Sequence, residues 1–201
     1  MKPTLNLKEF LTEGRLGPIT LGLERDRIIS LIGEPDHWSE KSAGQSKEEA
    51  TRWRYGCMFI GFLKRRGIQR KGLSVRPIVT VESDVTAMGL YFNTGYPLPE
   101  VFHAEGYFPH GETKLTEFET YLRNEAIEFE GVENNVNAVA LVTNADVAIL
   151  ARYKVTGTHG IIRVSPDLTI ENIIYPASEY PFLRPPSKGL EEAKGNGNTT
   201  E

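Results

Sequence analysis

The chain has 201 residues, of which 39% are hydrophobic and 25% charged, the balance of a globular protein large enough to bury a core. Its longest uninterrupted apolar runs are a few residues, far below the roughly 20 that a membrane-spanning helix needs, and no apolar signal segment opens the sequence, so we expect a cytoplasmic protein. Residues 1–100 hold 15 Lys and Arg against 12 Asp and Glu, whereas residues 101–201 hold 8 against 15, and neither half is basic enough to predict bulk nucleic-acid binding.

The first half of the chain reads as two short helices followed by strands. Residues 5–13 suit one or two helical turns ended by Gly14. Glu24–Ile32 is predicted to be an amphipathic helix that Gly33 and Pro35 terminate, although Glu24 is a poor N-cap. After a polar loop the alternation of residues predicts four strands, Arg52–Tyr55, Cys57–Leu63, Ile78–Glu82 and Ala87–Phe92, with a basic loop at Lys64–Gly72 and a turn at Ser83–Asp84.

The second half repeats this order. Residues 93–112 read as a loop rich in Pro and aromatic residues. Apolar residues at spacings of three and four predict a helix from Lys114 to about Glu130, ended by Gly131. Four β-rich runs follow, Val136–Val142, Val147–Tyr153, Gly160–Val164 and Thr169–Ile174, with turns expected at Asn144–Ala145, Thr156–Gly157 and Pro166–Asp167.

The order of helix, four strands, loop, helix, four strands predicts an antiparallel α+β protein made of two helix-plus-meander units. We place the first unit at residues 1–95, an aromatic and Pro-rich connecting loop at 96–112, the second unit at 113–176 and a Pro/Gly-rich disordered tail at 177–201. Two arrangements stay open at this point: a tandem repeat of separate units, or one continuous antiparallel sheet with the helices on one face.

The segment Leu21–Pro35 carries a pattern of small turn, Gly, polar helical turn, apolar helix and Gly-x-Pro, and strands follow it. In this it resembles proteins similar to the outer-membrane assembly lipoprotein BamE and to β-lactamase inhibitor proteins, together with bacterial immunity-like proteins. The resemblance implies a helix packed on an antiparallel sheet, often in tandem, and protein binding as the activity. The chain departs from these proteins in having no lipoprotein signal and no cysteine pair.

Motifs of known chemistry are absent from the sequence: there is no G-x-S-x-G elbow, no phosphate-binding P-loop and no G-x-G-x-x-G fingerprint. Cys57 is the single cysteine, and its apolar neighbours predict a buried structural thiol. His103, Glu105 and His110 could supply metal ligands from one loop, but their spacing matches no helical ligand pattern, and histidines that bind nothing are the favoured interpretation. We therefore expect no cofactor and no metal.

Two segments are candidates for binding. The first is basic and interleaved with aromatic residues, which suits an acidic protein or a phosphate backbone, although a solvated hairpin loop explains it equally well. The second is the aromatic loop, which either binds a partner or covers the junction of the two halves. The candidate binding residues are Arg52, Arg54, Lys64, Arg65, Arg66, Arg70, Lys71, Phe102, Tyr107 and Phe108.

These observations rank three functions. The first is a non-catalytic cytoplasmic protein-binding protein, in particular an immunity-like inhibitor of a toxin, with a protein partner and no membrane. The alternative is a nucleic-acid or anionic-ligand binder that uses residues 64–71, and the second alternative is a hydrolase or metal enzyme. The sequence gives neither the partner nor the oligomeric state.

Overall fold

The computed structural model describes residues 2–39, 44, 46–71, 74–92, 95–134, 138–158 and 161–177, and within these ranges the side chains other than those of residues 64–83, 133–138 and 153–166. The elements in chain order are β1 (Thr4–Asn6), α1 (Leu7–Glu13), α2 (Arg25–Ile32), β2 (His37–Trp38), β3 (Arg52–Tyr55), β4 (Met58–Lys71), β5 (Ser74–Tyr91), β6 (His103–Glu105), α3 (Leu115–Asn124), β7 (Phe129–Asn134), β8 (Ala138–Thr143), β9 (Ala148–Thr158) and β10 (Ile161–Tyr175). Among these residues no helix combines the length and the apolarity needed to cross a membrane.

Eight strands form one sheet in the order β2-β3-β4-β5-β10-β9-β8-β7. Each half of the chain contributes a four-stranded antiparallel meander, and the two meanders join where β5 pairs antiparallel with β10, from Tyr91 opposite Asn172 to Met88 opposite Tyr175. The predicted α+β class is thus confirmed. Of the two arrangements left open by the sequence, the structure has the continuous antiparallel sheet, to which each half of the chain contributes four strands.

The two units also place their helices in the same way. Glu24, directly before α2, forms an antiparallel bridge with Asp84 in β5, and Lys114, directly before α3, forms one with Thr169 in β10. In each unit the residue before the helix is thereby tied to the last strand of the meander. The same local arrangement occurs twice in one chain.

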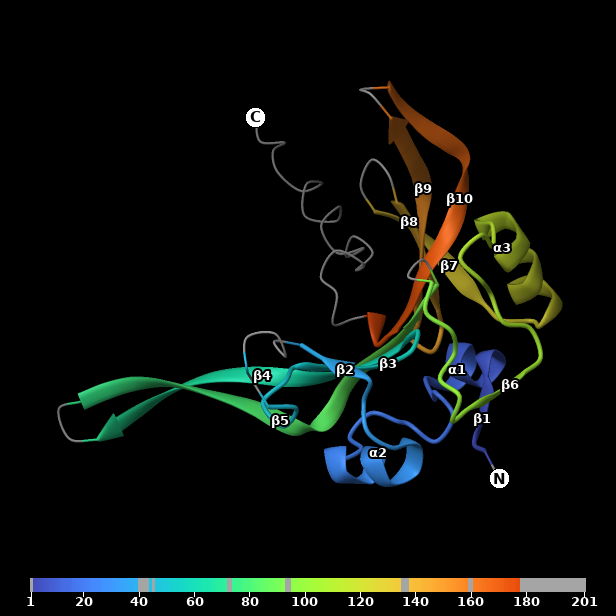
Figure 1. Ribbon diagram of the computed structural model, residues 1–201. Helices are drawn as coiled ribbons and strands as arrows, with labels where there is room; N and C mark the ends of the chain where they lie inside the picture. The colour runs from blue at the N-terminus through green and yellow to red at the C-terminus, as the bar shows by residue number, and fades with distance from the viewer. Residues whose placement is uncertain are drawn as a thin grey trace, which may run out of the picture.

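All three helices lie on the outer side of the strongly bent sheet (Figure 1). Their buried side chains, among them Phe10 of α1, Ile28 of α2 and Phe118 of α3, belong to one large apolar cluster with the inward side chains of the strands. Burial of this surface is the main stabilising contribution to the fold. The other side of the sheet, called the second face below, has its own smaller apolar cluster.

Local signals explain the first two helices. The Asn6 side chain caps α1 by accepting hydrogen bonds from the amides of Lys8 and Glu9, and Gly14 ends it in the left-handed conformation at φ +66°. Helix α2 runs to Ile32 with Gly33 as its C-cap, and Glu24 makes no side-chain cap bond, as its residue type predicts. Both helices therefore lie where the sequence predicts them.

The strands differ from the prediction at several places. Lys64–Lys71 is not a loop: it continues β4 and pairs with β5 from Lys64 opposite Val81 to Lys71 opposite Ser74. Ser83–Asp84 is not a turn either, because β5 runs unbroken through it. The last two predicted strands are therefore one strand, β5, and β4 is longer than the alternation of residues indicated, while β2, which was not predicted, is the fourth strand of this meander.

Similar corrections apply in the second half. Pro166 and Asp167 lie inside β10, at a register shift between Val164 and Leu168, where the irregular pairing tolerates a proline that cannot donate to the ladder. The predicted turn at Thr156–Gly157 is likewise paired strand in β9. Only the predicted turn at Asn144–Ala145 is kept, between β8 and β9.

The third helix is shorter than predicted. It ends at Asn124, and Ala126 takes a φ of +55°, which breaks the helical path. Phe129 and Gly131, expected at the end of the helix, belong instead to β7. The predicted tail, apart from the buried Ala177, lies outside the described residues.

Candidate binding face

Strand alternation gives the first unit two different sides. Trp53 and Tyr55 of β3 are buried against the helices at 1% and 2% exposure. Arg52 and Arg54 alternate with them and therefore lie on the second face. Trp53 and Tyr55 therefore face the core, and the two arginines face away from it.

Arg52 is held in place on the second face by two aromatic residues. Its guanidinium lies 5.0 Å from the centre of the Phe59 ring, and its Nη1 donates a 3.0 Å hydrogen bond to the Tyr91 hydroxyl. The Phe59 and Tyr91 rings pack at 4.8 Å between centroids. An exposed cation whose position is fixed in this way loses little side-chain entropy when it binds an anion.

Arg54 has an aromatic partner of its own. Its guanidinium lies 4.1 Å above the ring of Tyr96, which is 47% exposed and follows the first meander. Because Arg54 pairs with Phe59 across β3 and β4, this second cation–π pair lies beside the first. We call Arg52, Arg54, Phe59, Tyr91 and Tyr96 the arginine–aromatic cluster.

A shallow cleft of about 320 Å³ adjoins the arginine–aromatic cluster. Gly61 and Ala87 face each other in its lining, where a Cβ on Gly61 would lie 3.2 Å from the Ala87 Cβ. The lining residues are Ser39, Thr51, Arg52, Phe59, Gly61, Phe62, Leu63, Thr86 and Ala87. Leu63 is 39% exposed, so an apolar side chain accompanies the cation at the cleft.

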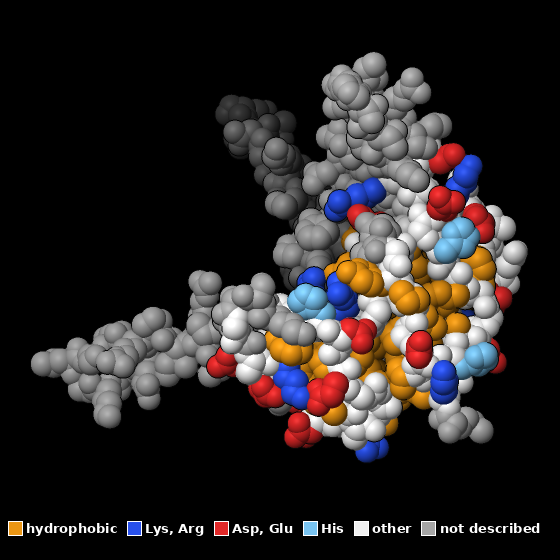
Figure 2. Space-filling view, in the orientation of Figure 1, with side chains coloured by type: hydrophobic (Ala, Val, Ile, Leu, Met, Phe, Trp, Pro, Cys, Tyr) orange, Lys and Arg blue, Asp and Glu red, His pale blue; other side chains and the backbone are white. Residues whose placement is uncertain are grey.

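Figure 2 shows that Lys or Arg side chains and a histidine gather next to apolar side chains at the inner corner of the molecule, where the β4–β5 ribbon leaves the body. The second face continues from this corner across β5, β10, β9 and β8. Its apolar cluster consists of Phe59, Val132, Ala140, Ala148, Leu150, Ile174 and Ala177, with Tyr91 and Val142 packed against it. The candidate surface thus has cations at its rim, and the apolar cluster beside them is buried.

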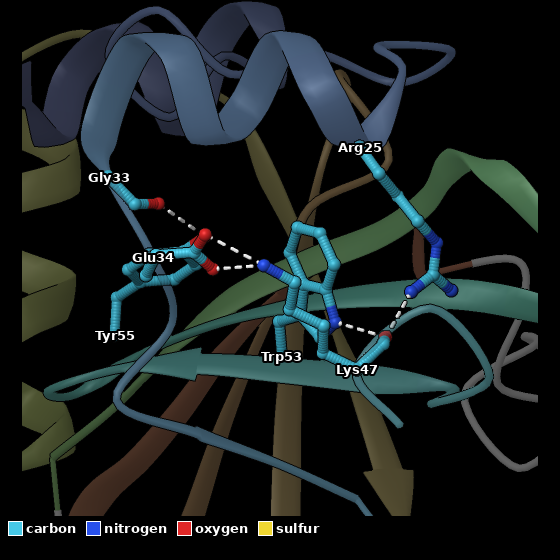
Figure 3. Close-up of polar contacts among 6 residues, drawn as sticks. All are labelled: Arg25, Gly33, Glu34, Lys47, Trp53 and Tyr55. Atoms are coloured by element: carbon cyan, nitrogen blue, oxygen red, sulfur yellow. Dashed lines mark hydrogen bonds and ion pairs between the residues drawn. The ribbon is translucent and has the colours of Figure 1, made fainter. Parts of the chain in front are cut away.

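A polar network behind β3 fixes this strand from the helix side (Figure 3). Arg25 of α2 donates 2.7 Å and 2.6 Å hydrogen bonds to the carbonyls of Lys47 and Ala50, and its guanidinium stacks 3.6 Å above the Phe62 ring. The Trp53 indole donates to the same Lys47 carbonyl at 2.8 Å. This network positions the strand that carries Arg52 and Arg54.

The network also explains two pKa shifts. Burial lowers the pKa of Arg25 to about 10, so the side chain is still charged at neutral pH. Burial raises the pKa of Tyr55, whose hydroxyl donates to the Gly33 carbonyl at 3.1 Å. At the mouth of the network the Lys47 ammonium pairs with the Glu34 carboxylate at 2.6 Å. No sequence motif marks Arg25, because its partners lie more than 20 residues away.

The structure separates the sequence-predicted binding residues into three groups. Arg52 and Arg54 lie together on the second face, as described above. Lys64, Arg65, Arg66, Arg70 and Lys71 lie along the distal part of β4, where the backbone is described and the side chains lie outside the described set. The aromatic residues of the connecting segment lie elsewhere.

The aromatic residues of the connecting segment pack on the helix side. Phe102 is 5% exposed and lies against Gly17, where it belongs to the core. Tyr107 stacks on Tyr121 of α3 at 4.4 Å between ring centres, and Phe108 packs edge-on against Phe92. Of the two interpretations of this segment, these contacts favour a cover over the core.

The described residues form no site for metal chemistry at His103, Glu105 and His110 and none for thiol chemistry at Cys57. Across the described ranges no group of three His, Cys, Asp or Glu side chains is placed to hold a metal ion, so His103, Glu105 and His110 do not converge there. Cys57 is 3% exposed, and burial raises the pKa of its thiol to about 11. Its buried position agrees with a structural thiol.

Comparison with known proteins found no matching family model, no matching curated protein and no matching solved structure.

Proposed function

We propose that this chain is a non-catalytic protein-binding protein whose interface is the second face of the sheet, centred on the arginine–aromatic cluster. The observation that supports this most directly is Arg52, which is exposed yet held by Phe59 and Tyr91 beside a cleft. Arginine and aromatic side chains are the residues most enriched in the energetic centres of protein interfaces. The cationic rim suits a partner that presents acidic side chains around an apolar contact.

Within this class we propose an immunity-like inhibitor, because the Leu21–Pro35 pattern resembles such proteins. An inhibitor of this kind acts by covering the surface of its target and needs no catalytic group. A toxin-like reading frame directly beside the gene would favour this identity. A neighbourhood of unrelated genes in every source of the sequence would count against it.

The binding proposal is tested with the full chain, tagged and produced at its native level in its source cells. A stoichiometric protein partner should co-purify, and the double variant Arg52→Glu, Arg54→Glu should lose it because both cations of the cluster are reversed. The matched control is Arg27→Glu, Arg123→Glu, which reverses two exposed arginines on the helix side. Loss in both variants, or in neither, would remove the second face as the interface.

A second candidate function rests on the shape of the β4–β5 ribbon, which projects away from the body of the sheet (Figure 1). Residues 64–81 of this ribbon contain six Lys and Arg and no Asp or Glu. Of these cations, Lys64, Arg65, Arg66, Arg70 and Lys71 lie on β4 where its backbone pairs with β5. Two-stranded ribbons of this width fit a groove of duplex DNA.

Salt dependence distinguishes this candidate from the first. If the ribbon binds phosphates, the triple variant Arg65→Ala, Arg66→Ala, Arg70→Ala should weaken binding to a labelled duplex and reduce the slope of log affinity against log salt by roughly 3. Unchanged affinity and slope would exclude nucleic acid as the ligand of this ribbon. Arg52→Glu, Arg54→Glu serves as the comparison, since it alters the second face and leaves the ribbon intact.

A further inference from the structure

The last strand of each meander has an irregularity at the same place. In β5 the pairing with β4 skips Thr86, and in β10 the pairing with β9 skips Glu171. Each skipped residue lies two positions after the residue that is bridged to the start of a helix, Asp84 in the first unit and Thr169 in the second. Thr86 and Glu171 therefore occupy equivalent positions in the two units.

The equivalence extends across the neighbouring strands, where the two units carry side chains of different size. The residues paired across three strands beside the irregularity are Ala87, Gly61 and Arg52 in the first unit and Asn172, Leu150 and Ala140 in the second. Leu150 thus stands where the first unit has Gly61, and its side chain is part of the second-face apolar cluster. The first unit has smaller residues at the two positions nearest the irregularity, and there they line the cleft.

The two units also differ in charge at this place. In the second unit the Glu171 carboxylate pairs with the Nε of Arg152 at 2.9 Å, so its charge is balanced within the chain. In the first unit the equivalent of Glu171 is Thr86, which has no charge, and the cation at the cleft is Arg52. Among the ion pairs of the described residues, none joins Arg52 to a carboxylate. The first unit thus presents a cation at a cleft and lacks the acidic residue of the second.

Hydroxyl groups beside Arg52 add hydrogen-bond donors to the cleft. The Ser39 hydroxyl accepts hydrogen bonds from the amides of Thr51 and Arg52 at 3.0 Å and 3.1 Å and lies 3.2 Å from the Thr51 hydroxyl. One of these two hydroxyls donates to the other, so the pair has one O–H left for an acceptor. A guanidinium has five N–H donors, and the bond to Tyr91 uses one of those on Arg52. This set of donors suits a carboxylate, which only accepts hydrogen bonds.

We propose that the cleft binds a carboxylate of the partner protein, carried by an Asp or Glu side chain next to an apolar residue. The carboxylate pairs with Arg52 and supplies the negative charge that Glu171 supplies in the second unit. Leu63, which is 39% exposed in the lining, contacts the apolar neighbour. That the carboxylate belongs to a protein partner rests on the proposed function, whereas its binding to the cleft can be measured without that partner.

The test titrates the full-length chain with the peptide acetyl-Leu-Glu-Leu-amide and follows its backbone amides by NMR. The amides of Gly61 and Ala87 should shift and saturate, and the matched peptide acetyl-Leu-Gln-Leu-amide should bind at least about tenfold more weakly because it lacks the charge. Equal affinity for the two peptides would overturn the proposal. Binding of hexanoate without binding of the acidic peptide would also overturn it, because the ligand would then be a free acid.

A pair of variants at Thr86 tests the same site from the side of the protein. Thr86→Glu gives the cleft the carboxylate of the second unit and should weaken the acidic peptide at least about tenfold, whereas the uncharged Thr86→Gln should stay within about twofold of the wild type. Arg52→Gln changes an exposed side chain and should also weaken the peptide at least about tenfold, which keeps the test valid if Thr86→Glu does not fold. Wild-type affinity in Arg52→Gln, or equal affinity in the two Thr86 variants, would contradict the proposal.

The same variants separate this inference from the proposed function. In the co-purification experiment Thr86→Glu should lose the partner and Thr86→Gln should keep it. A partner that is lost in Arg52→Glu, Arg54→Glu but kept in Thr86→Glu would leave the second face as the interface and overturn the cleft as the site of the carboxylate. If no partner co-purifies with the wild type, the proposed function fails, and the peptide titration still decides whether the cleft binds a carboxylate.

Discussion

The Thr143 hydroxyl, buried at the end of β8, donates a 2.8 Å hydrogen bond to the backbone carbonyl of Leu11 in α1. Leu11 is in the last turn of its helix, where carbonyls lack an intrahelical donor. The bond therefore satisfies a helix end and ties the N-terminal helix to the second meander. The two halves are joined at this point as well as at the centre of the sheet.

Replacing Thr143 by Val should lower the free energy of unfolding by about 1–3 kcal/mol, because the Leu11 carbonyl then stays buried without its donor. The measurement is urea denaturation followed by circular dichroism. Thr120→Val is the control, since the Thr120 hydroxyl is exposed and bonds within α3, and it should change stability by no more than about 0.5 kcal/mol. Equal effects of the two variants would show that the Leu11 bond contributes nothing specific.

The guanidinium of Arg25 is the centre of the network behind β3, and Arg25→Leu should cost about 2–4 kcal/mol. The variant leaves the Ala50 carbonyl without its donor and removes the stacking on Phe62. Amide exchange in residues 46–50 should accelerate more than in β9, because the loss is local. Arg27→Leu, on the exposed side of the same helix, should leave both stability and exchange nearly unchanged.

Gly89 lies in β5 where a side chain has no room. A Cβ there would meet the Ile173 carbonyl and come within 2.5 Å of the Phe59 ring, so Gly89→Ala should destabilise the protein by about 3 kcal/mol or more. Gly131, also in a strand, has nothing within 4 Å of such a Cβ, and Gly131→Ala should be neutral or slightly stabilising. Thermal unfolding of the two variants in parallel checks the contrast, and similar midpoints would contradict it.

The raised pKa of Cys57 makes a pH-dependent contribution to stability. Its pKa is about 11 in the folded chain against 9.0 for the free thiol, so above pH 9 the unfolded state loses a proton that the folded state keeps. This contribution is fully present below pH 9 and is lost as the pH rises toward 11, by about 2 kcal/mol at pH 10.5. The difference in unfolding free energy between the wild type and Cys57→Ala should shrink by this amount between pH 8 and pH 10.5. A constant difference would mean that the thiol ionises alike in both states.

The parts of the fold that the sequence predicted are those with local signals. Gly14 and Gly33 end their helices through backbone geometry that a few neighbouring residues determine. The alternation of Arg52 to Tyr55 likewise identifies a half-buried strand and the direction of its side chains. Both kinds of signal are complete within one short segment.

The parts that were missed depend on residues far apart in the chain. Lys64–Lys71 lacks apolar alternation, and its extended conformation comes from pairing with β5. The parallel pairing of β1 with β6 joins segments about 100 residues apart, from Thr4 opposite His103 to Asn6 opposite Glu105. The register shift at Pro166 can be identified only from the pairing of β10 with β9.

The candidate site likewise has residues that could be predicted from the sequence and residues that could not. Arg52 and Arg54 could be named from β3 alone, whereas Phe59, Tyr91 and Tyr96 join them only through pairing and chain reversal. Phe102 was chosen for its residue type, and its packing against Gly17 gives it a place in the core. Composition identified the cations of the cluster, but the aromatic residues that fix them required the fold.

The antiparallel pairing of β5 with β10 gives the chain the organisation of a homodimer whose subunits have been fused. An isologous dimer of one such unit would join through the same edge strand, and each unit alone would leave that edge unpaired. In a true homodimer every substitution appears on both sides of the axis. Fusion removes this constraint, so one unit could acquire the arginines of β3 while the other became acidic. A surface with two unlike ends, which an asymmetric partner requires, is available to the fused chain and not to the symmetric pair.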